Sequence, residues 1–266
     1  MKKFWGFLLV IVLMTSCGEY QSLLKSNDYN LVYKKAIEYY NKGDYQRAMN
    51  LLDGVRSVFV GQAKAQNIAY YRAFCSYNMK DYQIASDLFK QFIQTYPESS
   101  FAEECLYMMG FCDYKASPKP RLDQQVTEKA IREFQLYLSR YPYSMRKDKV
   151  NTYMDEMRDK LSYKAYLSAK NYYLREHYKA AVISLQNCLK DYPGSKYREE
   201  IMYMLFVSKD RMAVNSVEDK KVERYNNARE EYYYFADEYP NSKFAADMKK
   251  KYDIINDYLK DYKFDD

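Results

Sequence analysis

Residues 85–97 read ASDLFKQFIQTYP, an alanine followed twelve residues later by a proline. The same spacing recurs as AIREFQLYLSRYP at 130–142, AVISLQNCLKDYP at 181–193 and AREEYYYFADEYP at 228–240. Four residues after each alanine stands a large side chain: Phe89, Phe134, Leu185 and Tyr232. Because proline cannot continue a helix and the alanine leaves room for a close helix neighbour, each copy predicts the second helix of a repeated helical hairpin.

Ala48 with Leu52 begins a further copy in the same phase, although no proline follows it. Small residues at Ala36, Ala73, Gly110 and Ala169 mark the matching place in the first helix of each hairpin. This arrangement is typical of tetratricopeptide repeats, whose hairpins bury their apolar faces only against their neighbours. The fold predicted is all-α: an α-solenoid of about five tetratricopeptide-like hairpins plus a C-terminal capping helix.

The repeat spacing also predicts where the hairpins depart from the short form. Gly110 to Ala130 and Ser208 to Ala228 are longer than the other intervals, which predicts insertions near 117–123 and 214–222. The first helices of the hairpins are expected at 29–41, 63–79 and 101–115, and in the fourth repeat as one long helix at 147–171. Two of the second helices are expected to begin at Tyr45 and Tyr82, and a third to span 125–140. A last helix is expected at 243–262. Residues 18–28 are expected to be an extended tether, with Asp28 among the residues that cap the first helix.

The chain begins with the features of an exported lipoprotein. Lys2 and Lys3 precede an apolar run, residues 4–13, that is too short to span a bilayer, and small residues then lead to Cys17. This segment resembles a bacterial lipoprotein box, which implies a signal peptide at 1–16 and diacylglycerol and a further acyl chain on Cys17. The alternative is an ordinary secretory signal with an incidental cysteine.

A single Glu19 after Cys17 favours the periplasmic face of the outer membrane over the cell surface. The domains expected are a lipidated tether at 17–28, repeats 1–3 at 29–145, and repeats 4 and 5 with the capping helix at 146–266.

The composition offers no catalytic centre. The 42 basic and 36 acidic residues are dispersed, so no nucleic-acid partner is expected. His177 is the only histidine, no C-x-x-C motif occurs, and no glycine-rich phosphate loop is visible. Two disulfides among Cys75, Cys105, Cys112 and Cys188 would suit an oxidising compartment, but their repeat positions favour buried small side chains. We therefore expect no enzyme activity, no metal and no cofactor other than the covalent lipid on Cys17.

Tyrosines recur on one face of the first helices. Counting three residues back and four forward from the small residue gives the pairs Tyr33 and Tyr40, Tyr70 and Tyr77, Tyr107 and Tyr114, and Tyr166 and Tyr173. Asn67 recurs in phase with Asn30. In repeats 1–3 these tyrosines with Asn67 predict a groove for a peptide, since rigid rings give contact area at low entropic cost. The alternative is that the tyrosines pack helix against helix.

Residues 157–173, MRDKLSYKAYLSAKNYY, and the insertion PRLDQ at 120–124 resemble the BamD family of outer-membrane β-barrel assembly lipoproteins. The resemblance implies a non-enzymatic scaffold at the periplasmic face of the outer membrane. It implies that the C-terminal half docks on a barrel-forming partner, with Arg198 at that interface, beside other lipoproteins of the machinery. It also implies that the N-terminal repeats receive targeting segments of unfolded barrel proteins.

Two other functions fit part of the pattern. Another periplasmic tetratricopeptide lipoprotein could coordinate cell-envelope or peptidoglycan synthesis, and would not co-purify with a barrel protein. A carbohydrate-capturing lipoprotein on a helical repeat scaffold would be expected to be longer, with loop-rich insertions. The only tryptophan, Trp5, lies in the signal segment.

Overall fold

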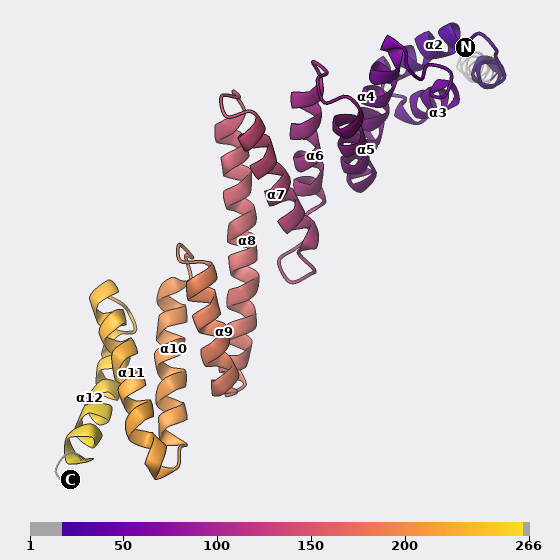
Figure 1. The fold of residues 1–266 in the computed structure, drawn as a ribbon. Helices are drawn as coiled ribbons and strands as arrows, with labels where there is room; N and C mark the ends of the chain where they lie inside the picture. Colours follow the sequence, from indigo (N-terminus) through magenta and orange to yellow (C-terminus); the bar gives the residue numbers. More distant parts are fainter. Residues whose placement is uncertain (1–17, 263–266) are drawn as a thin grey trace, which may run out of the picture. The chain divides into compact units, whose positions relative to one another are not determined.

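The structure, a computed structural model, describes residues 18–262. In this part of the chain five helix pairs follow one another and a single helix closes the series (Figure 1), so the α-solenoid of helical hairpins is confirmed. The chain divides into two compact units, which are described separately. Unit 1 ends at Met157, apart from residues 119–122, and unit 2 comprises those four residues and everything from Arg158 onward.

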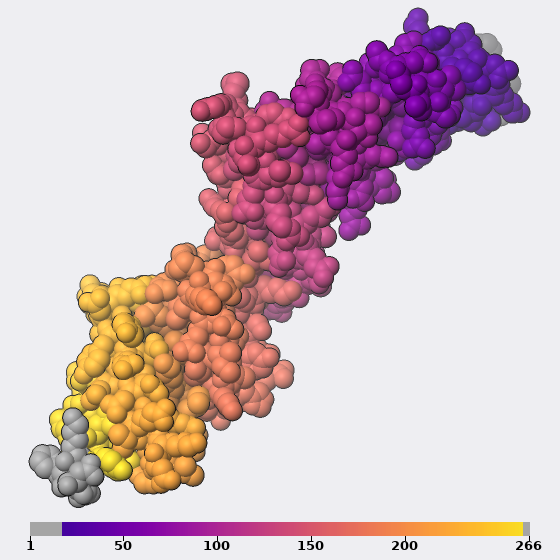
Figure 2. Space-filling model, viewed as in Figure 1, coloured from indigo at the N-terminus to yellow at the C-terminus, as the bar shows by residue number. Residues whose placement is uncertain are grey.

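Unit 1 contains three helix pairs and the start of a long helix. Its helices are α2 (Tyr29–Asn41), α3 (Tyr45–Val55), α4 (Ala63–Asn78), α5 (Tyr82–Thr95), α6 (Ala102–Ala116) and α7 (Gln125–Arg140). Unit 2 contains the remainder of the long helix, from Arg158 onward, followed by α9 (Tyr178–Asp191), α10 (Arg198–Val214), α11 (Glu218–Glu238) and α12 (Ala245–Asp261). The long helix itself, α8 (Lys147–Leu174), has 28 residues. In the space-filling view, side chains fill the gaps that the ribbon leaves between neighbouring helices of each unit (Figure 2).

The repeated alanines pack where the spacing predicts. Ala36, Ala48, Ala73, Ala85, Ala130, Ala169, Ala181 and Ala228 have no exposed surface. Gly110 takes the same position in α6, and a Cβ atom there would lie 2.9 Å from Cδ1 of Phe134 in α7. The bulky residues four positions after the alanines fill the space beside them, as Phe89, Phe134 and Leu185 do with no exposed surface. Small residues at the crossing points therefore allow the helices of each hairpin to approach closely.

The helix ends have local causes. Each Tyr-Pro word stops a helix one residue before its tyrosine, at Thr95, Arg140, Asp191 and Glu238, because a residue before proline is driven out of the α region. The turns inside the short hairpins place Gly43, Lys80 and Glu176 at positive φ. The next residue in each turn donates its N–H to the carbonyl five residues back, as Asp44 does to Tyr39 at 3.0 Å. These left-handed caps close the first helix of each pair.

Two sequence-based expectations about local structure are corrected. Residues 18–24 are helical rather than extended, because Tyr20 and Leu23 are buried in the first core cluster. The Tyr20 hydroxyl also accepts a hydrogen bond from Asn50. The expected insertion at 214–222 is a short connection at 215–217, and the extra residues lengthen α11 to 21 residues instead. The expected cap at Asp28 is confirmed, since its carboxylate accepts the N–H of Leu31 at 3.0 Å. Cys17 and the signal segment lie outside the described residues.

A buried ionic cluster links three helices of unit 1. The Nζ atom of Lys129 lies 2.8 Å from Oδ2 of Asp113 and 3.7 Å from Oε1 of Glu133. Ser86 donates its hydroxyl to Asp113 at 3.0 Å and accepts from Lys129 at 3.2 Å. Oε2 of Glu133 has no hydrogen-bond partner, and burial raises the pKa of this carboxyl to about 8. The cluster therefore places two buried carboxyl groups, those of Asp113 and Glu133, beside one cation, the ammonium group of Lys129.

Candidate functional site

A hollow of about 550 Å³ lies on unit 1 between α2, α4 and the start of α6. We call it the tyrosine hollow. It brings together three of the predicted groove residues, Tyr33, Asn67 and Tyr70. Its other lining residues are Lys34, Ile37, Glu38, Asn41, Tyr71 and Phe101. Register positions on two successive first helices thus meet at one surface, as the spacing predicts.

The lining of the tyrosine hollow combines aromatic rings with polar side chains. Tyr70 packs its ring on Phe101, with the centroids 4.6 Å apart, and meets Tyr71 edge to face at 5.6 Å. Burial raises the pKa of Tyr70 to about 12. Burial also raises the pKa of Tyr33, which is hydrogen-bonded to Asn67. Both phenols are therefore neutral at neutral pH and can donate a hydrogen bond.

The charged residues that line the tyrosine hollow balance each other: Lys34 and Glu38, both on α2. Asn41 and Asn67 add amides that can both donate to and accept from a peptide backbone. Rings with a polar tip, amides and balanced charge suit an extended polypeptide segment with apolar side chains better than a strongly charged ligand.

The other four predicted groove residues lie outside the lining of the tyrosine hollow. Tyr40 packs edge to face on Tyr71 at 4.9 Å, and burial raises its pKa to about 12. Tyr77 packs against Tyr82 and Phe111, and Tyr107 is buried. Tyr114 donates its hydroxyl to Glu156 at 2.5 Å. In these four positions the rings pack between helices, and a role for them in peptide binding stays a prediction.

Sequence reasoning missed Phe101, although a signal for it was present. In two copies the residue four places after the Tyr-Pro proline covers the tyrosine three places before the small residue of the preceding first helix: Phe101 covers Tyr70, and Tyr197 covers Tyr166 at 4.3 Å. In the last copy Phe244 covers Tyr203 at 4.2 Å, although Tyr203 lies three places before Phe206 rather than before a small residue. Four places after Pro142 stands Arg146 instead of an aromatic residue, and its guanidinium carbon lies 4.5 Å from the ring centroid of Tyr107. One face of each of these tyrosines is therefore used within the repeat, and only the remaining surface can meet a ligand.

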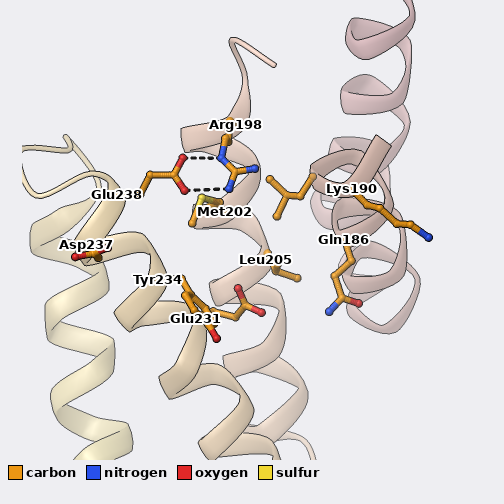
Figure 3. A pocket seen from close by; sticks show the side chains of 10 residues that line it. Gln186, Lys190, Arg198, Met202, Leu205, Glu231, Tyr234, Asp237 and Glu238 are labelled. Carbon is orange, nitrogen blue, oxygen red and sulfur yellow. Dashed lines mark hydrogen bonds and ion pairs between the residues drawn. The ribbon is translucent and has the colours of Figure 1, made fainter. Parts of the chain in front are cut away.

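Unit 2 holds Arg198, the residue predicted to face a partner, in a hollow of about 550 Å³ that we call the Arg198 hollow (Figure 3). Arg198 opens α10 and makes a two-pronged ion pair with Glu238 at the end of α11, at 2.6 and 2.9 Å. The hydrogen bond from Arg198 lowers the pKa of Glu238. Tyr234 and Asp237 line the same hollow and are exposed. Arg198 is thus at the surface, but its charge is already paired within the chain.

The four cysteines in the described residues are free and buried, as the repeat positions predict. Burial raises the pKa of Cys75 and Cys105 to about 12 and that of Cys188 to about 11, so these thiols are protonated and poor nucleophiles at neutral pH.

Within residues 18–262 no group of three or more histidine, cysteine or acidic side chains is placed to hold a metal ion. None of the helices in that range has the length and apolar character needed to cross a bilayer.

Comparison with known families decides the relationship. The family model of the outer membrane lipoprotein YfiO matches residues 25–223 and, in a second overlapping match, residues 168–265. The chain belongs to the YfiO outer membrane lipoprotein family. This YfiO-family protein therefore combines membership of an outer-membrane lipoprotein family with a fold of repeated helical hairpins.

Two solved structures of tetratricopeptide-repeat proteins are similar to the YfiO-family chain over most of its length. The TPR2AB domain of yeast Sti1 in a complex with pHSP90 is 14% identical and covers 86% of this chain and 98% of its own, with a TM-score of 0.39. A TPR repeats protein from Bacteroides fragilis is 12% identical and covers 88% of this chain and 100% of its own, with a TM-score of 0.42. Among curated proteins, no sequence is significantly similar to this chain.

Proposed function

We propose that this YfiO-family lipoprotein is a non-enzymatic scaffold of the outer-membrane β-barrel assembly machinery. It binds the barrel-forming partner and other lipoproteins of the machinery through unit 2, and targeting segments of unfolded barrel proteins through unit 1. Lipid on Cys17 holds it at the periplasmic face of the outer membrane, and it uses no other cofactor. Family membership supports the compartment, and the tyrosine hollow is the observation that supports the client-binding role.

The chemistry of the tyrosine hollow matches such a client. An unfolded barrel strand presents alternate apolar side chains along a backbone whose N–H and C=O groups are unpaired. The rings of Tyr33, Tyr70 and Phe101 can receive apolar side chains, and the amides of Asn41 and Asn67 can pair with the backbone. Because the charges of the lining balance, binding would depend on shape and hydrogen bonds more than on net charge.

Replacing Tyr33 and Asn67 together with alanine is expected to weaken binding of a C-terminal peptide of a barrel protein about tenfold, or about 1.4 kcal/mol. Both residues are half-buried rather than part of the fully buried core, so the fold should survive. Fluorescence anisotropy of the labelled peptide, with far-UV circular dichroism as a folding check, measures the effect. Tyr143→Ala is the matched control, because Tyr143 is 97% exposed in the same unit and outside the hollow. Equal affinity for the double variant and the control would reject the tyrosine hollow as the client site.

The partner interface can be tested through the ion pair that Arg198 already makes. An exposed pair of this kind contributes about 0–1 kcal/mol to stability, so a partner carboxylate could replace Glu238 at little cost. Arg198→Glu is expected to reduce co-purification of the barrel-forming partner at least tenfold, because two carboxylates would then meet. Glu238→Gln frees the guanidinium and should leave that binding unchanged or stronger. If both variants weakened the complex equally, Arg198 would have only a structural role.

A further inference from the structure

The largest of the hollows described lies over the second half of α8 in unit 2 and measures about 700 Å³. We call it the Arg121 hollow. Its lining combines cations, tyrosine rings and leucines: Arg121, Tyr163, Lys164, Tyr166, Leu167, Ser168, Lys170, Asn171, Leu174 and Tyr197. Neither the tyrosine hollow nor the Arg198 hollow shares any of these residues.

The lining of the Arg121 hollow is positively charged. Three of its lining residues are cationic and none is acidic. Glu200 lies nearby, but it is occupied by Lys170 Nζ at 2.8 Å and by the Tyr166 hydroxyl at 2.9 Å. Those hydrogen bonds lower the pKa of Glu200 despite its partial burial. The cations of Arg121 and Lys164 therefore face the hollow without a carboxylate of this chain.

Arg121 owes its position to the two-proline insertion that interrupts the third repeat. The Nζ atom of Lys164 on α8 donates to the main-chain carbonyl of Leu122 at 2.8 Å, which ties the residue after Arg121 to the helix. The side chain of Arg121 is exposed. Among the contacts of the described residues, its guanidinium makes no hydrogen bond or ion pair. A planar guanidinium held in this way can receive a carboxylate through two parallel hydrogen bonds.

An aromatic and aliphatic wall stands beside these cations. Tyr197 stacks on Tyr166 at 4.3 Å and on Tyr163 at 5.3 Å, so the rings are held rigidly. Leu167 is half-buried and Leu174 is 65% exposed, which leaves apolar surface uncovered in this unit. Ser168 and Asn171, both exposed on the same helix, supply a hydroxyl and an amide between the cations and the leucines.

We propose that the Arg121 hollow binds an acidic segment of a partner polypeptide. Arg121 and Lys164 take a carboxylate of the segment, and an apolar side chain beside that carboxylate lies on Leu167 and Leu174. Asn171 and Ser168 pair with the segment's main chain. The inference depends on the protein-binding role of the repeat fold, but not on which machinery the protein serves or on the tyrosine hollow.

Charge complementarity favours a peptide of this composition. Lys164 has two further N–H donors after its bond to Leu122, and Arg121 has all five of its donors available. A carboxylate placed here would meet no acidic side chain of the lining. The amide and hydroxyl groups between the cations and the leucines suit a peptide main chain, which carries one donor and one acceptor per residue.

The test uses the full mature chain and the labelled peptide acetyl-Ser-Leu-Asp-Phe-Glu-Leu-Ser-amide. Its control is the same peptide with asparagine and glutamine in place of the two acids. We expect Arg121→Glu to weaken binding of the acidic peptide at least tenfold in fluorescence anisotropy and to leave the neutral peptide unchanged. Lys179→Glu is the matched control, because it makes the same change of net charge at an exposed residue of α9 outside the lining. The same Arg121→Glu variant should bind the barrel-protein peptide of the tyrosine hollow as the unaltered chain does, which separates this proposal from the proposed function.

Three outcomes would overturn the proposal. The acidic and neutral peptides could bind the unaltered chain equally well. Arg121→Glu and Lys179→Glu could weaken binding to the same extent, which would show attraction by net charge alone. Finally, vesicles of phosphatidylglycerol with phosphatidylcholine could co-sediment with the unaltered chain but not with Arg121→Glu while the acidic peptide fails to bind, which would assign the site to a lipid headgroup.

Discussion

Replacing Phe134 with alanine is expected to lower the free energy of unfolding of unit 1 by about 3–5 kcal/mol. Phe134 has no exposed surface, and its ring lies against Gly110 of α6 in the core cluster that also contains Phe89 and Tyr137. The rigid helix packing around it cannot collapse fully, so a cavity remains and adds to the lost transfer free energy. Urea denaturation followed by far-UV circular dichroism measures the change.

Leu136→Ala is the control for this experiment. Leu136 lies two residues away on the same helix but is 53% exposed. Its replacement should change the free energy of unfolding by no more than about 0.5 kcal/mol. A loss below about 1 kcal/mol for Phe134→Ala would show that the α6–α7 contact is not the centre of the core of unit 1.

Replacing Lys129 with methionine is expected to cost about 3–5 kcal/mol at pH 9, above the raised pKa of Glu133, because it leaves Asp113 and Glu133 buried without their cation. Asp113 is 1% exposed and Glu133 is 8% exposed. Methionine keeps most of the volume of the lysine stem, so the loss reports on charge more than on packing. Lys90→Met on the exposed side of α5 is the control and should be nearly neutral.

The effect of Lys129→Met should shrink as the pH falls. Burial raises the pKa of Glu133 from its ordinary value near 4.5 to about 8 in the folded chain. The folded state therefore binds this proton more tightly than the unfolded state. Its contribution to stability is fully present below about pH 4.5 and is lost as the pH rises through about 8. At pH 5 the neutral Glu133 needs no cation, so thermal unfolding of Lys129→Met should lie closer to that of the unaltered chain than at pH 9, where Glu133 of the unaltered chain is ionised. A cost that is the same at both pH values would contradict the raised pKa.

Helix positions followed closely from the sequence where local chemistry sets them. The predicted helix at 125–140 is α7 to the residue, because a proline after Tyr141 stops it. Segments without such a stop were less certain. Residues 18–24 carry few local helix signals, and their helix depends on burying Tyr20 and Leu23 against α2 and α3, which the local sequence does not show. Extra residues near 214–222 could form either a loop or additional helical turns, and only the core of unit 2 selects the longer α11.

The candidate sites show the same division. Periodicity placed Tyr33, Asn67 and Tyr70 on one face, and they do line one hollow. It did not show that Tyr107 would be buried, because that depends on Tyr137 of α7 and on Arg146, which pack against its ring. The Asp113, Lys129 and Glu133 cluster could not be predicted, since charged residues are spread along every helix and only the packing of α5, α6 and α7 selects these three.

By itself, the sequence determined the hairpin repeat, its phase and most helix ends, because alanine spacing and Tyr-Pro stops act within a few residues of the chain. Only the tertiary structure decided which tyrosines have a surface left for a ligand, that Arg198 is paired with Glu238, and that Arg121 is held over α8. The physical reason is the distance along the chain over which each effect acts. A helix stop is a local steric effect, whereas the exposure of a ring or the pairing of a charge depends on side chains about 20 to 40 residues away that only folding brings together.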